Sequence, residues 1–113
     1  MESKEVAQAI AELLSRKKAK DVVMIDIAEK SSFADFFVIA TGTSDRQLGA
    51  LADDVEDKFA ELGIDPKSKD GRPDTGWILV DGGDVIVNIF TNDTRDKYTL
   101  EKIWSDCESI LVD

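Results

Sequence analysis

The chain has 113 residues, 42% of them hydrophobic and 34% charged, which excludes a disordered tail and fits one compact domain, residues 1–113, with one core. Its 24 Asp and Glu against 14 Lys and Arg give a formal charge of -10. Affinity for DNA or RNA depends mainly on basic contacts to phosphates, so this balance argues against a direct grip on nucleic acid.

Cysteine usage and apolar runs point to a cytoplasmic location. Cys107 is the single cysteine, so no intrachain disulfide can form to stabilise the fold in an oxidising compartment. The first twenty residues lack a signal-peptide core, and the longest apolar runs, such as residues 36–40, are too short to cross a bilayer. Neither secretion nor membrane insertion is expected.

The N-terminal third predicts a helix followed by a strand. Ser3 is expected to cap a helix whose apolar residues recur at helical spacing: Val6, Ile10, Leu13 and Leu14. Residues 21–27 are rich in β-branched side chains and predict a strand with Val23, Ile25 and Ile27 on one face.

The middle of the chain predicts a buried strand and a capped helix. Residues 36–41 form a continuous apolar run, typical of a central strand covered on both faces. The sequence Ser44-Asp45-Arg46-Gln47 fits a capping box, in which the serine hydroxyl and the Gln side chain each satisfy a free amide. The helix that follows has a stripe of Leu48, Leu51, Val55, Phe59 and Leu62.

Gly63 is expected to end that helix, and residues 63–76, which contain both prolines, predict one long loop. Residues 77–80 and 85–90 predict two antiparallel strands joined through Asp81-Gly82-Gly83-Asp84, where glycines can supply positive φ angles. From Thr94 onward a last helix is expected, because apolar residues recur at helical spacing: Leu100, Ile103, Trp104, Cys107 and Ile110. The predicted fold is therefore α+β, a mixed sheet with helices packed on it, in the order αββαββα.

Gly42-Thr43-Ser44 lies between a strand and a helix, a position at which nucleotidyltransferases hold phosphates. Such enzymes also need acidic metal ligands on a following strand, and the next acids here fall within a helix. Capping of the helix is the interpretation that the sequence favours, and phosphate binding is the alternative.

Asp81 and Asp84 supply two carboxylates, the minimum for a metal site or for acid and base catalysis. Aspartates are also common in turns, and the protein has neither a histidine nor a third acid at ligand spacing. Cys107 lies on an apolar stripe and has no histidine to activate it. We therefore expect no enzyme activity, no catalytic residues, no metal and no cofactor.

Trp77, Tyr98 and Trp104 are either core residues or parts of a binding surface. Large aromatics in a small domain are usually buried, but Trp77 and Tyr98 fall at the ends of elements, where side chains can reach the surface. Aromatic residues with nearby Arg and Lys, here Arg95 and Lys102, dominate protein-binding hot spots. Asn88, within an apolar strand, needs water or a hydrogen-bonding partner, and a neighbouring loop is the simplest one.

The chain resembles the ribosomal silencing factor family, also called the Iojap-like family, from about Val6 to Trp104. The resemblance is carried by Asp35 with the apolar run into Gly42-Thr43-Ser44, then by Trp77, Asp81, Gly83-Asp84 and residues 95–104. It has two departures: Asn88 stands where the family usually has histidine, and Gly82 where a larger residue is common. The first argues against any role that needs a titratable imidazole, and the second affects only local stiffness.

The resemblance implies a fold like that of nucleotidyltransferases without their catalytic acids. It also implies a protein that binds the fourteenth protein of the large ribosomal subunit, blocks joining of the small subunit and represses translation under nutrient limitation. Homodimers are common in the family. The partner-binding residues that we expect from it are Trp77, Asp81, Arg95, Tyr98, Leu100, Glu101, Lys102 and Trp104. A phosphate-handling transferase and an acidic adaptor for an unrelated basic protein remain the alternatives.

Overall fold

The computed structural model describes residues 2–98, 107 and 109–112, and for residues 73, 96–98 and 111 it describes the backbone alone. Its core is one mixed sheet of six strands in the order β3-β4-β5-β2-β1-β6. The helices are α1 (Ser3–Arg16), α2 (Asp45–Glu61) and α3 (Asn92–Tyr98), with a 3-10 turn at Pro73–Thr75. The strands are β1 (Lys20–Asp26), β2 (Phe36–Thr41), β3 (Ser68–Arg72), β4 (Trp77–Asp81), β5 (Val85–Phe90) and β6 (Ser109–Leu111).

The predicted α+β class is confirmed, and the seven predicted elements occur in the predicted order with two further strands, β3 and β6. β2 pairs in parallel with β5 at the centre of the sheet, whereas the other pairings are antiparallel. All six residues of β2 are buried, as predicted for a strand covered on both faces.

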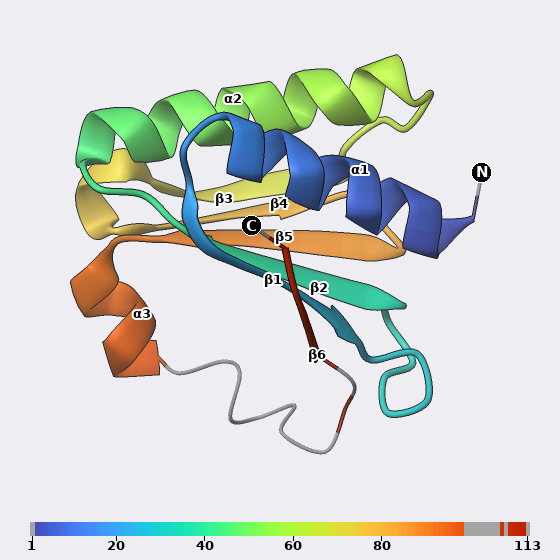
Figure 1. Cartoon of the computed structure of the whole chain (residues 1–113). Coiled ribbons are helices and arrows are strands. Elements are labelled where there is room, and N and C mark those ends of the chain that lie inside the picture. The colour runs from blue at the N-terminus through green and yellow to red at the C-terminus, as the bar shows by residue number, and fades with distance from the viewer. Residues whose placement is uncertain (1, 99–106, 108, 113) are drawn as a thin grey trace.

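Two apolar layers lie on the two faces of the sheet. Helices α1 and α2 cover one face, where their stripes pack against strand residues such as Met24, Val38 and Val87 (Figure 1). The other face carries a second buried cluster that contains Val23, Ile25, Ile27, Ala34, Phe37, Ile39, Ile86 and Phe90. Helix α3 lies on this second side of the sheet (Figure 1). Within the described ranges, no helix has the length and apolar character needed to cross a bilayer.

Strand β3 corrects the prediction of one long loop over residues 63–76. Its five residues are all exposed, and it pairs with β4 from Arg72 opposite Trp77 to Ser68 opposite Asp81. Within the described sheet it is an edge strand. Lys69 joins it to α2, because its ammonium lies 2.9 Å from Glu56 Oε1 and 3.2 Å from Asp53 Oδ1. The hydrogen bond to Glu56 is the main reason that the pKa of Lys69 is raised above its ordinary value.

Only the first part of the predicted last helix lies within the described residues. Helix α3 is described as far as Tyr98, and residues 99–106, which include Leu100, Ile103 and Trp104, lie outside the described residues. Cys107 is not in a helix, and Ile110 is in β6, opposite Met24 of β1. The helical spacing that predicted one continuous element through Cys107 and Ile110 was therefore misleading.

Two local predictions also need correction. Ser3 is the first residue of α1, and the cap position is Glu2, whose side chain makes no capping hydrogen bond. The hairpin between β4 and β5 is antiparallel as predicted, with a φ of 94° at Gly83. At Gly82 a Cβ atom would lie 2.5 Å from a ring carbon of Phe59 on α2, so the Phe59 ring takes the space that a larger residue would need.

Candidate partner-binding site

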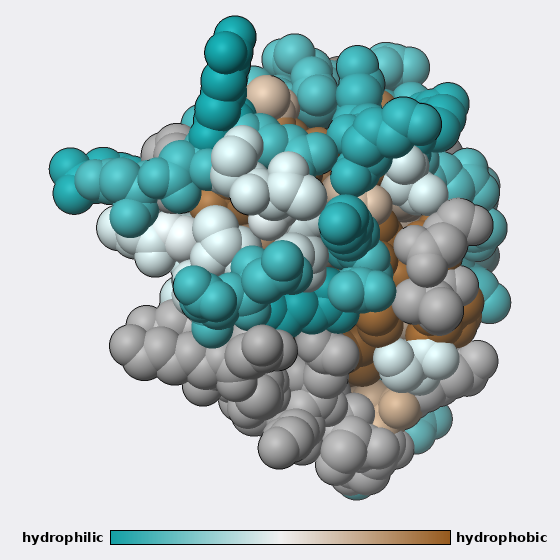
Figure 2. Space-filling view, turned by 60° about the vertical axis from the view of Figure 1, so that its left-hand side comes forward, coloured by the Kyte–Doolittle hydropathy of each residue, from teal (hydrophilic) through white to brown (hydrophobic). Residues whose placement is uncertain are grey.

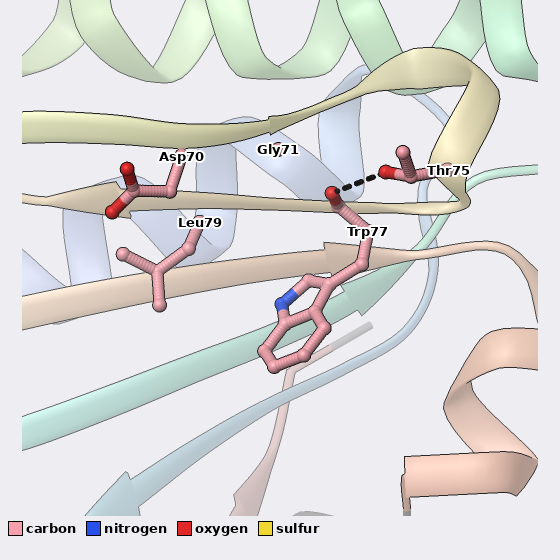
Figure 3. Close-up of a pocket in the computed structure, with 5 residues that line it drawn as sticks. All are labelled: Asp70, Gly71, Thr75, Trp77 and Leu79. Carbon is pink, nitrogen blue, oxygen red and sulfur yellow. Dashed lines mark hydrogen bonds between the residues drawn. The ribbon is translucent and has the colours of Figure 1, made fainter.

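A pocket of about 230 Å³ lies where β3 pairs with the start of β4. Its lining residues are Asp70, Gly71, Thr75, Trp77 and Leu79 (Figure 3). Trp77 and Leu79 supply apolar walls, and Asp70 adds a carboxylate from the exposed edge strand. We call these five residues the Trp77 pocket.

Strand alternation places the two apolar walls on one face. Along β4, Ile78 and Val80 are fully buried against the α1 and α2 layer, while Trp77, Leu79 and Asp81 are half-buried on the opposite face. Figure 3 shows the Trp77 and Leu79 side chains pointing away from the helix drawn above the sheet. The pocket therefore opens on the side of the sheet away from α1 and α2.

Trp77 is held by neighbours on one side and faces the pocket with the rest of its ring. Its indole Nε1 donates a hydrogen bond to Asn88 Oδ1 over 3.1 Å, and its ring centroid lies 5.2 Å from that of Phe90. The partner of Asn88 is thus a tryptophan on the adjacent strand, not the loop that the sequence suggested. Half-burial places Trp77 between the two predicted alternatives, at the border of the core and in the wall of a pocket.

The backbone of the turn before β4 shapes the rim of the pocket. The Thr75 hydroxyl lies 2.6 Å from the carbonyl oxygen of Arg72 and 3.2 Å from that of Trp77 (Figure 3). Gly71 has a φ of 88°, and a Cβ there would lie 2.1 Å from the Trp77 carbonyl oxygen. This close approach is possible only for glycine. In the view of Figure 2, hydrophilic residues gather on the upper part of the molecule.

The predicted site residues do not all gather at this pocket. Asp81 shares the face of Trp77 but lies at the other end of β4, opposite Ser68, whereas Trp77 lies opposite Arg72. Tyr98 is the last residue of α3 that the structure describes, and its side chain is not described. Leu100, Glu101, Lys102 and Trp104 lie outside the described residues. Four residues of the pocket were not predicted from the sequence: Asp70, Gly71, Thr75 and Leu79. Of these, only Leu79 has a signal in the sequence, its period-two spacing from Trp77.

Arg95 makes contacts within the domain. Its guanidinium donates to the backbone oxygen of Asp21 at 2.6 Å and to Thr41 Oγ1 at 2.8 Å. Thr41 is 1% exposed, and Asp21 has a left-handed backbone with a φ of 50°. Arg95 therefore ties α3 to the start of β1 and the end of β2.

Replacing Arg95 by alanine is expected to lower the free energy of unfolding by about 1–2 kcal/mol, because two charge-assisted hydrogen bonds are lost and a buried hydroxyl loses a donor. Chemical denaturation measures this. The matched control is Arg72→Ala, since the Arg72 side chain is 76% exposed and its ion pair with Asp74 is worth little. Equal stability of the two variants would contradict the structural role of Arg95.

The segment Gly42-Thr43-Ser44 forms a helix cap. Ser44 Oγ accepts a hydrogen bond from the Gln47 amide at 3.1 Å, as the capping box predicted. Gln47 reaches back one residue further than predicted, because its Oε1 accepts from the Thr43 amide at 2.6 Å and from the Thr43 hydroxyl at 2.8 Å. These polar groups have intramolecular partners that explain why Ser and Gln occur there.

Asp81 takes part in the hairpin turn, with its Oδ1 accepting from the Gly83 amide at 2.8 Å. The part of the chain that the structure describes contains no group of three or more His, Cys, Asp or Glu side chains arranged to hold a metal ion.

Comparison with known proteins assigns the chain to a family. The family model described as "Ribosomal silencing factor during starvation" matches residues 1–113. The chain belongs to the ribosomal silencing factor family. A "Ribosomal silencing factor RsfS" from Bacillus subtilis is 39% identical to it over 106 residues, which cover 94% of this chain and 90% of the relative. The chloroplastic protein Iojap of Zea mays is 30% identical over 104 residues, 92% of this chain and 45% of the maize protein.

Two solved structures have folds similar to that of this chain. A protein from Chromobacterium violaceum superposes with a TM-score of 0.88 at 36% identity, covering 93% of this chain and 88% of that one. A protein from Bacillus halodurans gives a TM-score of 0.77 at 33% identity, with 96% of both chains covered. Both solved structures therefore share the fold of this chain.

Proposed function

We propose that this protein is a cytoplasmic ribosomal silencing factor that binds the large ribosomal subunit through that subunit's fourteenth protein. While bound, it keeps the small subunit from joining and so represses translation when nutrients are scarce. The free protein is proposed to be a homodimer. Membership of the ribosomal silencing factor family is the observation that carries the proposal.

The chemistry of the Trp77 pocket supports a basic protein partner. An indole and a leucine side chain offer apolar contact, and Asp70 can pair with a cation at the same place. Aromatic anchors of this kind contribute most of the energy in many protein interfaces, and a cation over an indole gains further energy. Ribosomal proteins are basic, so a chain with a net charge of -10 is steered toward them and away from bare RNA.

The proposed contact surface combines the Trp77 pocket with the C-terminal segment. Asp81, Arg95, Tyr98, Leu100, Glu101, Lys102 and Trp104 belong to it as predictions from the family resemblance. Asp81 and Arg95 make hydrogen bonds within the domain, so Trp77 is the residue for which the geometry gives the strongest support. Blocking of the small subunit then needs no chemistry, since the body of a bound domain is an obstacle.

The test is sedimentation of purified ribosomal subunits from the organism that encodes this chain. Added protein is expected to migrate with the large subunit, and 70S formation on mixing with small subunits is expected to fall as its concentration rises. Protein that stays at the top of the gradient would refute ribosome binding, and protein that binds without reducing 70S formation would refute the blocking step. Metal-dependent turnover of a nucleotide would favour the transferase alternative.

A further inference from the structure

Asn88 is a polar residue in an apolar layer. It lies on β5 between Leu79 of β4 and Ile39 of β2, with 1% of its surface exposed. Its neighbours on this face belong to the second buried cluster, including Ile86 and Phe90. Burial of an amide among such side chains is unfavourable unless its hydrogen bonds are made.

The hydrogen bonds of this amide are only half made. The Asn88 Oδ1 accepts from the Trp77 indole, but the Asn88 Nδ2 has no partner among the residues that the structure describes. An indole N–H can only donate, so it must meet the amide oxygen, and this leaves the amide nitrogen on the other side. A buried donor without an acceptor lowers stability. On stability alone, an apolar side chain would suit this position better.

The Asn88 amide does, however, fix the orientation of the Trp77 indole. Trp77 also makes a tilted contact with Phe90, at an interplanar angle of 32°. Ring contact alone allows the indole to slide or turn over, whereas a directional hydrogen bond at Nε1 fixes which edge faces the sheet and which part faces the pocket. Preorganised anchors bind more tightly because less freedom is lost on binding.

We infer that Asn88 is a positioning residue for the docking surface: its buried amide oxygen holds the Trp77 indole in the orientation that lines the Trp77 pocket. The inference rests on the proposed function, because it concerns the surface proposed to bind the large subunit. It assigns part of the binding energy to a side chain that is itself too buried to touch a partner.

The first test is spectroscopic and needs no ribosome. The chain has two tryptophans, so in a Trp104→Phe background the remaining indole N–H signal in a ¹H–¹⁵N spectrum belongs to Trp77. Asn88→Leu keeps a similar shape and removes the acceptor. It is expected to shift that signal and to speed its exchange with solvent, while the thermal unfolding midpoint stays the same or rises. An indole signal that neither shifts nor exchanges faster would overturn the inference.

The second test is a double-mutant cycle on binding to purified large subunits, with Trp104 intact. Asn88→Leu and Trp77→Phe are each expected to weaken binding about fivefold or more, the usual net worth of one hydrogen bond. Because both remove the same bond, Asn88→Leu should cost nothing further when Trp77 is already Phe. Independent, additive losses would overturn the inference, as would wild-type affinity in Asn88→Leu.

Folding of the variants is controlled separately. If Asn88→Leu does not fold, Asn88→Val supplies a second apolar replacement with a β-branched side chain suited to a strand. If the wild-type chain does not bind large subunits, the proposed function fails, and the indole spectrum still decides whether Asn88 positions Trp77.

Discussion

Trp77→Ala is expected to weaken binding to the large ribosomal subunit by at least about 2 kcal/mol, roughly 30-fold, as for a central aromatic in an interface. The indole is half-buried, so its loss removes a wall of the pocket while most of the apolar layer beneath remains. The variant should therefore stay folded. Fluorescence or sedimentation titration against purified large subunits measures the affinity, and circular dichroism measures the fold.

Phe33→Ala is the matched control for that experiment. Phe33 is 58% exposed and lies in the loop between β1 and β2, at the opposite end of the strands from Trp77. Its removal takes away an aromatic surface of similar kind without touching the Trp77 pocket, so binding should not change. Unchanged affinity in Trp77→Ala would remove Trp77 from the site, and loss of folding would identify it as a core residue.

Gly71→Ala is expected to lower the free energy of unfolding by about 3 kcal/mol or to melt the pairing of β3 with β4. The positive φ at this position is unfavourable for alanine. The alanine Cβ would also lie 2.1 Å from the Trp77 carbonyl oxygen, far inside contact distance. Relief of that clash has to displace either β3 or the start of β4. Chemical denaturation gives the stability, and amide hydrogen exchange reports whether β3 has separated.

Gly63→Ala separates the two causes. Gly63 has a similar φ of 80°, but a Cβ atom there would meet nothing within 4 Å. Gly63→Ala should lower the free energy of unfolding by about 1 kcal/mol, because only the conformational penalty of the positive φ applies. If the two alanine variants are equally stable, the close approach at Gly71 has no energetic consequence and the description of the pocket rim is wrong.

Strong hydrophobic periodicity made most of the fold predictable. The apolar stripe of α2 predicted only a helix and the apolar run of β2 only a buried strand, because burial sets the spacing of their apolar side chains. β3 gave no such signal, since an edge strand with five exposed residues and a glycine at positive φ has no face to bury. The prediction that Ile110 lies in a helix was wrong for a different reason: the three residues of β6 are too few to distinguish a strand period from a helix period.

Among the residues of the candidate site, only Trp77 could be predicted from the sequence. Trp77 stood out as a costly aromatic at the start of a strand, and the family resemblance reinforced it. Asp70 and Thr75 join Trp77 through the pairing of β3 with β4 and the tight turn between them, and neither contact leaves a local pattern in the sequence. The placement of Asn88 beneath the indole likewise depends on the register between β4 and β5.

The pairing of β6 with β1 limits how early the sheet can be completed during folding. Val23 lies opposite Leu111, so this edge of the sheet joins segments from near the two ends of the sequence. Closing so large a loop carries the highest entropic cost of any strand pairing here, and non-local pairings of this kind slow folding. During synthesis, β1 therefore has an open edge until residues 109–111 have also left the ribosome, long after β1 itself has emerged.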